Sequence, residues 1–236
     1  MAQAFNNIIK KHIGNIMDEE GFVLYKTVDF IRLKEDGRLL QYIGFPSGKY
    51  GGSRNLEIGY LPLIMVHKRE DIASEVSGEM NNKPPCGWSS IRWDFPKKDA
   101  EYAEKSMLSI KKVIQEYSLP YLNKYCTFTN TLKMFEENNP DIVPPNYRML
   151  RVRKLRYKGY FALGAKDYIK AETYFKEYYS VFSPENKSNP TSKLIMAELE
   201  EILNIIHNPV DIEELMEKNR QNTIKILNLK KYIDVD

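Results

Sequence analysis

The chain has 236 residues, of which 42% are hydrophobic and 28% charged, and its formal net charge is only +3. These values are ordinary for one large globular domain or two small ones, and the apolar runs are all too short to cross a membrane. With no signal-peptide pattern, and two cysteines too far apart for a CxxC pair, we expect a bacterial-type cytoplasmic protein that has no membrane contact.

The first half of the chain predicts a helix followed by an antiparallel sheet. Apolar residues recur at helical spacing over residues 3–19, and Gly21 then ends the helix. Two strands follow on either side of Asp36-Gly37, a dipeptide typical of two-residue hairpins. Residues 55–66 predict a third strand, in which Pro62 indicates an edge position or a bulge. Residues 88–95 predict a fourth, so we expect about four strands.

The rest of the chain predicts helices. An apolar stripe covers residues 98–117 and should stop at Pro120, and a short helix follows near residues 129–137. The proline-rich stretch ENNPDIVPPN then marks a domain boundary. Beyond it we expect four helices, at residues 146–164, 167–182, 191–207 and 211–230. The fold class is therefore α+β, with an α+β domain at 1–145 and a helical region at 146–236 that can pack as one unit with it.

Two stretches resemble known families. YFALGAKDYIKAETYFKEYYSVFSPEN resembles the turn and second helix of a tetratricopeptide repeat, and a single copy predicts one helical hairpin near residues 150–184. AFNNIIKKHIGNIMDEEGF, FIRL, LQYIGFPSG and IQEYSLPYLNKYCTFTNTLKMFEEN follow in the order of the bacterial domain of unknown function 4304 family. This second resemblance covers about residues 4–138. It implies a bacterial cytoplasmic α+β domain and, because the family has no established catalytic residues, it implies no site.

The glycine-rich stretch IGFPSGKYGGS is not expected to hold a phosphate. A Walker loop needs one more residue between its glycines, a hydroxyl after the lysine and a following helix, whereas a strand pattern follows here. The stretch predicts a long hairpin connection instead. Its Lys49 and Tyr50, with Arg54, could contact a partner through their charges and ring.

Catalytic and metal-binding motifs are missing from the sequence. The three histidines are far apart, and Cys86 has no histidine or aspartate motif beside it. We therefore expect no cofactor, no metal and no catalytic residue that a motif would identify. Glu57, in the third predicted strand, is the one strand carboxylate that could face either a cleft or water.

The basic run NYRMLRVRKLRYKGY carries the strongest functional signal. Residues 142–166 contain seven Lys or Arg and no Asp or Glu, and Arg151, Lys154 and Lys158 share one face of the predicted helix. We rank three uses of this charge. Pairing within the protein, with the acidic stretches ELEEI or DIEELMEK, comes first, an acidic protein partner second and nucleic acid third.

These observations favour a non-enzymatic protein-binding module, and one version is an immunity-type protein that neutralises a toxin through its surface. The first alternative is an enzyme whose site is assembled from scattered residues, such as Glu57, Arg54 and Lys49. The second is a nucleic-acid-associated protein that uses the basic helix. The sequence leaves the identity of any partner and the oligomeric state open.

Overall fold

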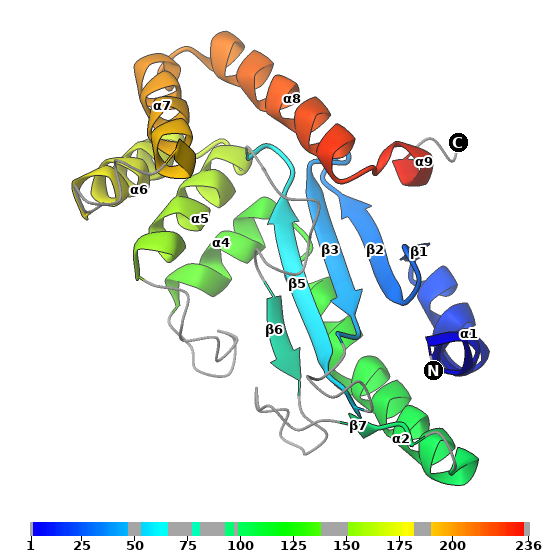
Figure 1. The fold of residues 1–236 in the computed structure, drawn as a ribbon. Coiled ribbons are helices and arrows are strands. Elements are labelled where there is room, and N and C mark those ends of the chain that lie inside the picture. Colours follow the sequence, from blue (N-terminus) through cyan, green and yellow to red (C-terminus); the bar gives the residue numbers. More distant parts are fainter. Residues whose placement is uncertain are drawn as a thin grey trace.

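The computed structural model describes residues 2–46, 53–65, 77–80, 93–96, 99–137, 151–181 and 190–233 (Figure 1). It confirms the α+β class, with an N-terminal helix, an antiparallel sheet and then mostly helices. The strands are β1 (Val23–Tyr25), β2 (Asp29–Lys34), β3 (Leu39–Gly44), β4 (Ser53–Arg54), β5 (Leu56–Pro62), β6 (Ser77–Met80) and β7 (Trp93–Asp94). The helices are α1 (Ala2–Glu19), α2 (Ala100–Val113), the π-helix η1 (Ile114–Ser118), α3 (Leu119–Lys124), α4 (Phe128–Glu136), α5 (Arg151–Gly164), α6 (Tyr168–Val181), α7 (Pro190–Ile205), α8 (Pro209–Ile226) and α9 (Lys230–Ile233).

The main sheet has five antiparallel strands, where about four were expected, in the order β1-β2-β3-β5-β6. The short strands β1 and β6 were not predicted, because so few residues give no readable alternation. Of the fourth predicted strand, Trp93–Asp94 forms β7, which pairs with β4 outside the main sheet, and residues 88–92 lie outside the described part. Pro62 is not on an edge strand. It ends β5 beyond the residues that pair with β6, so its missing N–H interrupts no bond of that pairing.

Left-handed residues close the first turns. The β2–β3 connection lies where Asp36-Gly37 predicted it, but Lys34 pairs with Leu39, so the loop has four residues rather than two. Three of them, Glu35, Asp36 and Gly37, have φ values of 53°, 52° and 73°. Gly21 ends α1 as predicted, at φ 74°, where the Gly21 N–H donates to Asp18 and the next N–H to Met17.

Pro120 does not stop the long helix. The chain passes from α2 through η1 into α3, which contains Pro120 in its first turn and runs on to Lys124. At the end of η1 the Leu119 N–H donates to the Ile114 carbonyl, five residues back. This wider turn comes directly before the proline, which has no N–H to offer the regular helical ladder.

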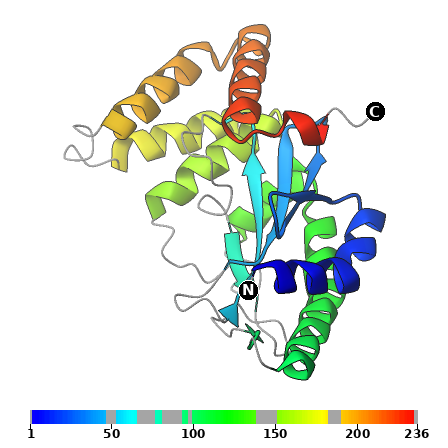
Figure 2. The same cartoon turned by 45° about the vertical axis from the view of Figure 1, so that its right-hand side comes forward.

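Both faces of the main sheet are covered by helices. On one face, Phe30, Ile43 and Ile58 belong to a core that also contains buried residues of α1, α2 and α4 to α8. On the other face, the apolar side chains of the strands meet three residues of α8 and its C-terminal connection, and we call this set the second cluster: Tyr25, Ile31, Leu40, Tyr42, Leu61, Leu63, Ile224, Leu227 and Leu229. Figures 1 and 2 show α8 and α9 at the upper end of the strands and α1 and α2 towards the lower end.

The helical region therefore shares its cores with the sheet domain. Phe128 of α4 and Phe161 of α5 lie 6.4 Å apart, ring centre to ring centre, across the proposed boundary, and Phe135 stacks on Phe161 at 5.1 Å. The boundary at 145/146 falls on residues outside the described part and stays a prediction. Helices α5 and α6 form a helical hairpin near residues 150–184, as the sequence predicts.

The α5–α6 hairpin depends on a small residue at Gly159, because a Cβ there would strike the buried ring of Phe175. We expect Gly159→Ala to lower the free energy of unfolding by about 1–3 kcal/mol, since a packed core does not accept the extra carbon. The matched control is Gly14→Ala in α1, where nothing lies within 4 Å of the added Cβ. That change should raise stability by roughly 0.5–1 kcal/mol. Urea unfolding measures both, and equal effects would contradict the close contact.

Candidate functional site

The three candidate residues of the glycine-rich connection are not brought together on a described surface. Lys49 and Tyr50 lie outside the described part of the chain. The Arg54 guanidinium lies over the Phe5 ring, 4.6 Å from its centre, and Nη1 donates to the Phe45 carbonyl at 3.3 Å. Burial lowers the pKa of Arg54, against the opposing effect of Asp29. Arg54 therefore makes contacts inside the protein. The strand pairing of β3 with β5 confirms that this stretch joins two antiparallel strands.

Part of the charge of the basic helix α5 faces the protein. Lys158 lies over the Tyr174 ring, with Nζ 5.4 Å from its centre, and burial lowers its pKa while Glu136 opposes that shift. Lys154 is half-buried, and Arg151 starts the helix with a side chain outside the described set. The face predicted for a partner is therefore partly occupied by α6 and by the carboxylate of α4.

Another cation of α5 confirms the predicted pairing with ELEEI. The Arg156 guanidinium lies 3.3 Å from the Glu198 carboxylate of α7, and both side chains are almost completely buried. The Tyr160 hydroxyl donates to the same carboxylate. Arg156 is not one of the three residues of the candidate face (Arg151, Lys154 and Lys158), so the pairing uses a part of α5 that the sequence did not single out. The nearby negative charge keeps the pKa of Arg156 above its ordinary value despite burial.

A second buried arginine holds α1 and α3 against the sheet. Arg32 is 4% exposed, and its Nε donates to Gln41 at 2.7 Å, one Nη to the Glu20 carbonyl at 2.9 Å and the other to Asn123 at 2.5 Å. Gln41 in turn donates to the Leu122 carbonyl at 2.6 Å. Every nitrogen of this guanidinium has an acceptor, so the network stabilises the fold and offers no free group for chemistry.

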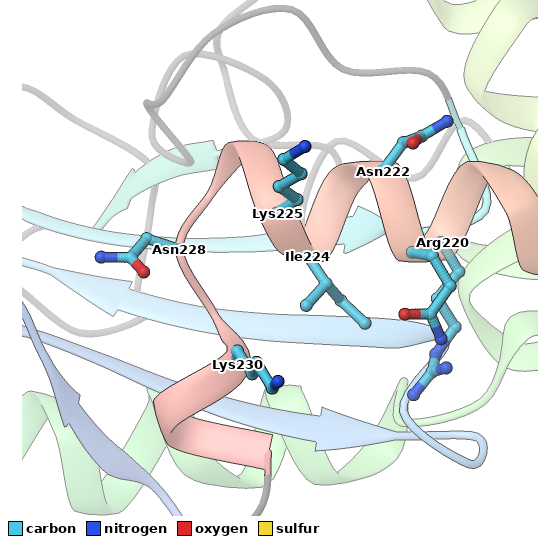
Figure 3. Close-up of a pocket in the computed structure, with 7 residues that line it drawn as sticks. Arg220, Asn222, Ile224, Lys225, Asn228 and Lys230 are labelled. Atoms are coloured by element: carbon cyan, nitrogen blue, oxygen red, sulfur yellow. The ribbon is translucent and has the colours of Figure 1, made fainter.

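A pocket of about 600 Å³ lies along the last turns of α8 and the start of α9 (Figure 3). Three of its described lining residues are cations, three carry amides, one is apolar and none is a carboxylate: Arg220, Lys225, Lys230, Gln221, Asn222, Asn228 and Ile224. Two smaller pockets, of about 250 and 270 Å³, each contain glutamate among their described lining residues. The large pocket is thus a local site of positive potential.

The cations of this pocket differ in how they are held. Arg220 is fixed, because its Nε donates to the Gly37 carbonyl at 2.9 Å and its Nη1 to Glu217 at 2.8 Å. Lys225 and Lys230 are exposed, and within the described residues neither has an ion pair. Figure 3 shows Arg220 and Ile224 pointing from α8 toward the strands, and Lys225 and Asn222 on the opposite side of the helix.

Sequence reasoning missed this pocket because α8 was classified as acidic from its first half. Residues 218–233 contain five Lys or Arg and no Asp or Glu, which is a signal of the same kind as the basic run of α5. We call these five residues the basic surface: Lys218, Arg220, Lys225, Lys230 and Lys231. Counting charge along half-helices rather than whole helices would have found it.

Within the described part of the chain, the remaining candidates are not brought together into a reactive centre. His12 contacts Glu104, with Nε2 2.7 Å from the carboxylate, and His207 lies 3.4 Å from Glu172. Among the described residues there is no group of three or more His, Cys, Asp or Glu that could hold a metal ion. His67 and Cys86 lie outside those residues, while Glu57 is half-buried on β5, paired with Gly44 and Glu79. In the same described part, no helix is both long and apolar enough to span a bilayer.

Comparisons with protein-family models, curated proteins and solved structures found no match to this chain. The resemblances seen in the sequence therefore stay predictions.

The Arg156–Glu198 pair gives a direct test of how α5 uses its charge. We expect Glu198→Ala to lower the free energy of unfolding by about 3–5 kcal/mol, because it leaves a buried guanidinium without its carboxylate. The matched control on the same helix is Glu201→Ala, which removes an exposed carboxylate 3.9 Å from Lys218 and should change stability by less than about 1 kcal/mol. Urea unfolding decides, and similar losses in both variants would show that the α5 charge is not held internally.

Proposed function

We propose that this chain is a non-enzymatic protein-binding module that takes an acidic protein partner on the basic surface of α8 and α9. The observation that carries the proposal is the 600 Å³ pocket, whose described lining residues include three cations and no carboxylate. An immunity-type protein, which blocks a toxin by covering part of its surface, is one version of this proposal.

The pattern of charge favours a protein partner over a small anion. Figure 3 shows Lys225 on α8 and Lys230 at the start of α9, so the two charges are carried by different elements. A folded partner presents several carboxylates over a wide area and can reach them together. Complementary charge of this kind mainly accelerates and orients association.

Nucleic acid is less compatible with the same surface. Single-stranded binding sites add aromatic rings on which bases stack, and the described lining of the pocket contains no aromatic residue.

The binding surface is placed on α8 rather than on α5 because the cations of the two helices are engaged differently. On α5, Arg156 is buried against Glu198, and Lys158 lies over Tyr174. On α8 and α9, two lysines are exposed with no ion pair in the described structure. A partner gains most from charges that are not already neutralised.

The test is a pull-down from lysate of the source cells with three forms of the protein. We expect the wild type to retain an acidic protein, and the Lys225→Glu/Lys230→Glu variant to lose it because two attractive contacts become repulsive. The control Lys10→Glu/Lys193→Glu makes the same change in net charge on exposed lysines of α1 and α7 and should keep the partner. Mass spectrometry identifies the retained protein and its charge.

Two results would contradict the proposal. One is a partner that both double variants retain, since the basic surface would then play no part. The other is a partner lost when Arg151, Lys154 and Lys158 are reversed but kept when Lys225 and Lys230 are reversed. That result would return the binding surface to α5.

A further inference from the structure

We infer that the acidic partner presents an extended segment, whose main chain is bound by the amide side chains of the pocket and whose carboxylates are bound by its lysines. This inference rests on the proposed function and names the form in which the partner is recognised. The observation behind it is that three amide side chains line the pocket, although binding of an acidic partner through charge alone would need none.

Amides and a cation alternate along the end of α8. Asn222, Lys225 and Asn228 follow one another at intervals of three residues, and all three are exposed. In the described structure, neither asparagine side chain has a hydrogen-bond partner. An asparagine side chain carries one acceptor and an NH₂ donor, so it can bind both the N–H and the C=O of a peptide main chain. Asn222 and Lys225 lie about one helical turn apart on α8, and Asn228 follows beyond its end, so the three groups form a row that suits an extended chain better than a compact ion.

The Asn228 amide is carried by a rigid turn. Asn228 has φ 53° and occupies the left-handed position that ends α8, where its N–H donates to the Lys225 carbonyl at 3.2 Å. The next N–H, of Leu229, donates to the Ile224 carbonyl at 2.9 Å, and both of these side chains are buried in the second cluster. The main chain that carries this amide is therefore ordered before a ligand binds, so ordering it adds nothing to the cost of binding.

The other lining residues fit the same ligand. Lys225 and Lys230 supply charge for carboxylates, and Arg220 is held in place by Gly37 and Glu217. Gln221 donates to Glu217 at 2.7 Å, which leaves its carbonyl oxygen for a main-chain N–H. A volume of about 600 Å³ lies within the range of sites that hold ligands of a few residues.

The experiment measures binding of a fluorescein-labelled octapeptide of alternating glutamate and serine by fluorescence anisotropy. The comparison probe is the same peptide with N-methylated main-chain amides, which keeps every carboxylate but removes the main-chain N–H donors. The protein variant is Asn222→Ala/Asn228→Gly, in which glycine keeps the left-handed turn while the amide is removed. Unchanged thermal unfolding of this variant confirms that the fold is intact.

We expect N-methylation and the asparagine double variant each to weaken binding by about tenfold, the effect of losing one or two hydrogen bonds. Combining the two changes should weaken binding by less than the product of the two separate effects, because the asparagine acceptors and the main-chain N–H groups take part in the same contacts. Lys225→Gln/Lys230→Gln should weaken binding as well, and should also reduce its dependence on salt, which the asparagine variant should leave unchanged.

Equal binding of both peptides, or an asparagine variant as strong as wild type, would overturn the main-chain inference. The proposed function would survive that result if the lysine variant still loses the peptide. Tighter binding of inorganic phosphate or of a single-stranded oligonucleotide of equal charge would also overturn the inference. If the wild type bound neither peptide, the inference would also be overturned. The proposed function would still be supported if a pull-down partner depended on Lys225 and Lys230.

Discussion

The contact of α8 and its C-terminal connection with the sheet is the interaction on which the rest of the structure depends. Ile224, Leu227 and Leu229 close the face of the sheet that α1 and α2 leave open, so both sides of the strands are removed from water. Two buried hydrogen bonds fix the position, from the Tyr25 hydroxyl to the Leu227 carbonyl and from the Thr223 hydroxyl to the Met65 carbonyl, both at 2.9 Å. The same contact holds the basic surface in place, because Ile224, Leu227 and Leu229 lie in the sequence among the residues that line the pocket.

The protein uses its positive charge in two different ways. Arg32 and Arg156 are buried, and Arg32 has an acceptor for each guanidinium nitrogen while Arg156 pairs with the Glu198 carboxylate, because an unpaired guanidinium in the interior would cost several kcal/mol. Lys225 and Lys230 stay in water at the surface, where their charge costs nothing to keep. A high local density of Lys and Arg in the sequence therefore indicates a binding surface only where no carboxylate of the folded protein pairs with these residues. The basic run of α5 is denser than that of α8, yet part of it has such partners.

Elements with several turns or clear alternation were predictable, and their partners in space were not. Helix α1, the β2–β3 hairpin, β5 and the helices from α5 to α8 follow from the spacing of apolar residues and from turn residues such as Gly21 and Gly37. Strands β1 and β6 are too short to give such a pattern, and Pro120 gave a false stop because a π-turn accommodates it. The apolar face of α8 was readable, but its partner sheet lies more than 150 residues earlier in the sequence, and no local pattern connects the two. The pocket lies at that junction and so was not predictable either.

The two halves of α8 have different roles, and two lysines of the basic surface, Lys225 and Lys230, have no ion pair in the described structure. In the acidic half, Glu213 pairs with Arg38 of the hairpin at 2.8 Å and with Lys166 of the α5–α6 turn at 3.4 Å, so its charge connects three parts of the fold. In the basic half, the contacts with the sheet come from apolar side chains, from Thr223 and the main chain, and from Arg220, which donates to the Gly37 carbonyl of the β2–β3 turn. Lys225 and Lys230 take no part in them. Stability therefore constrains the acidic half, whereas Lys225 and Lys230 are not required by the fold and remain available to a ligand.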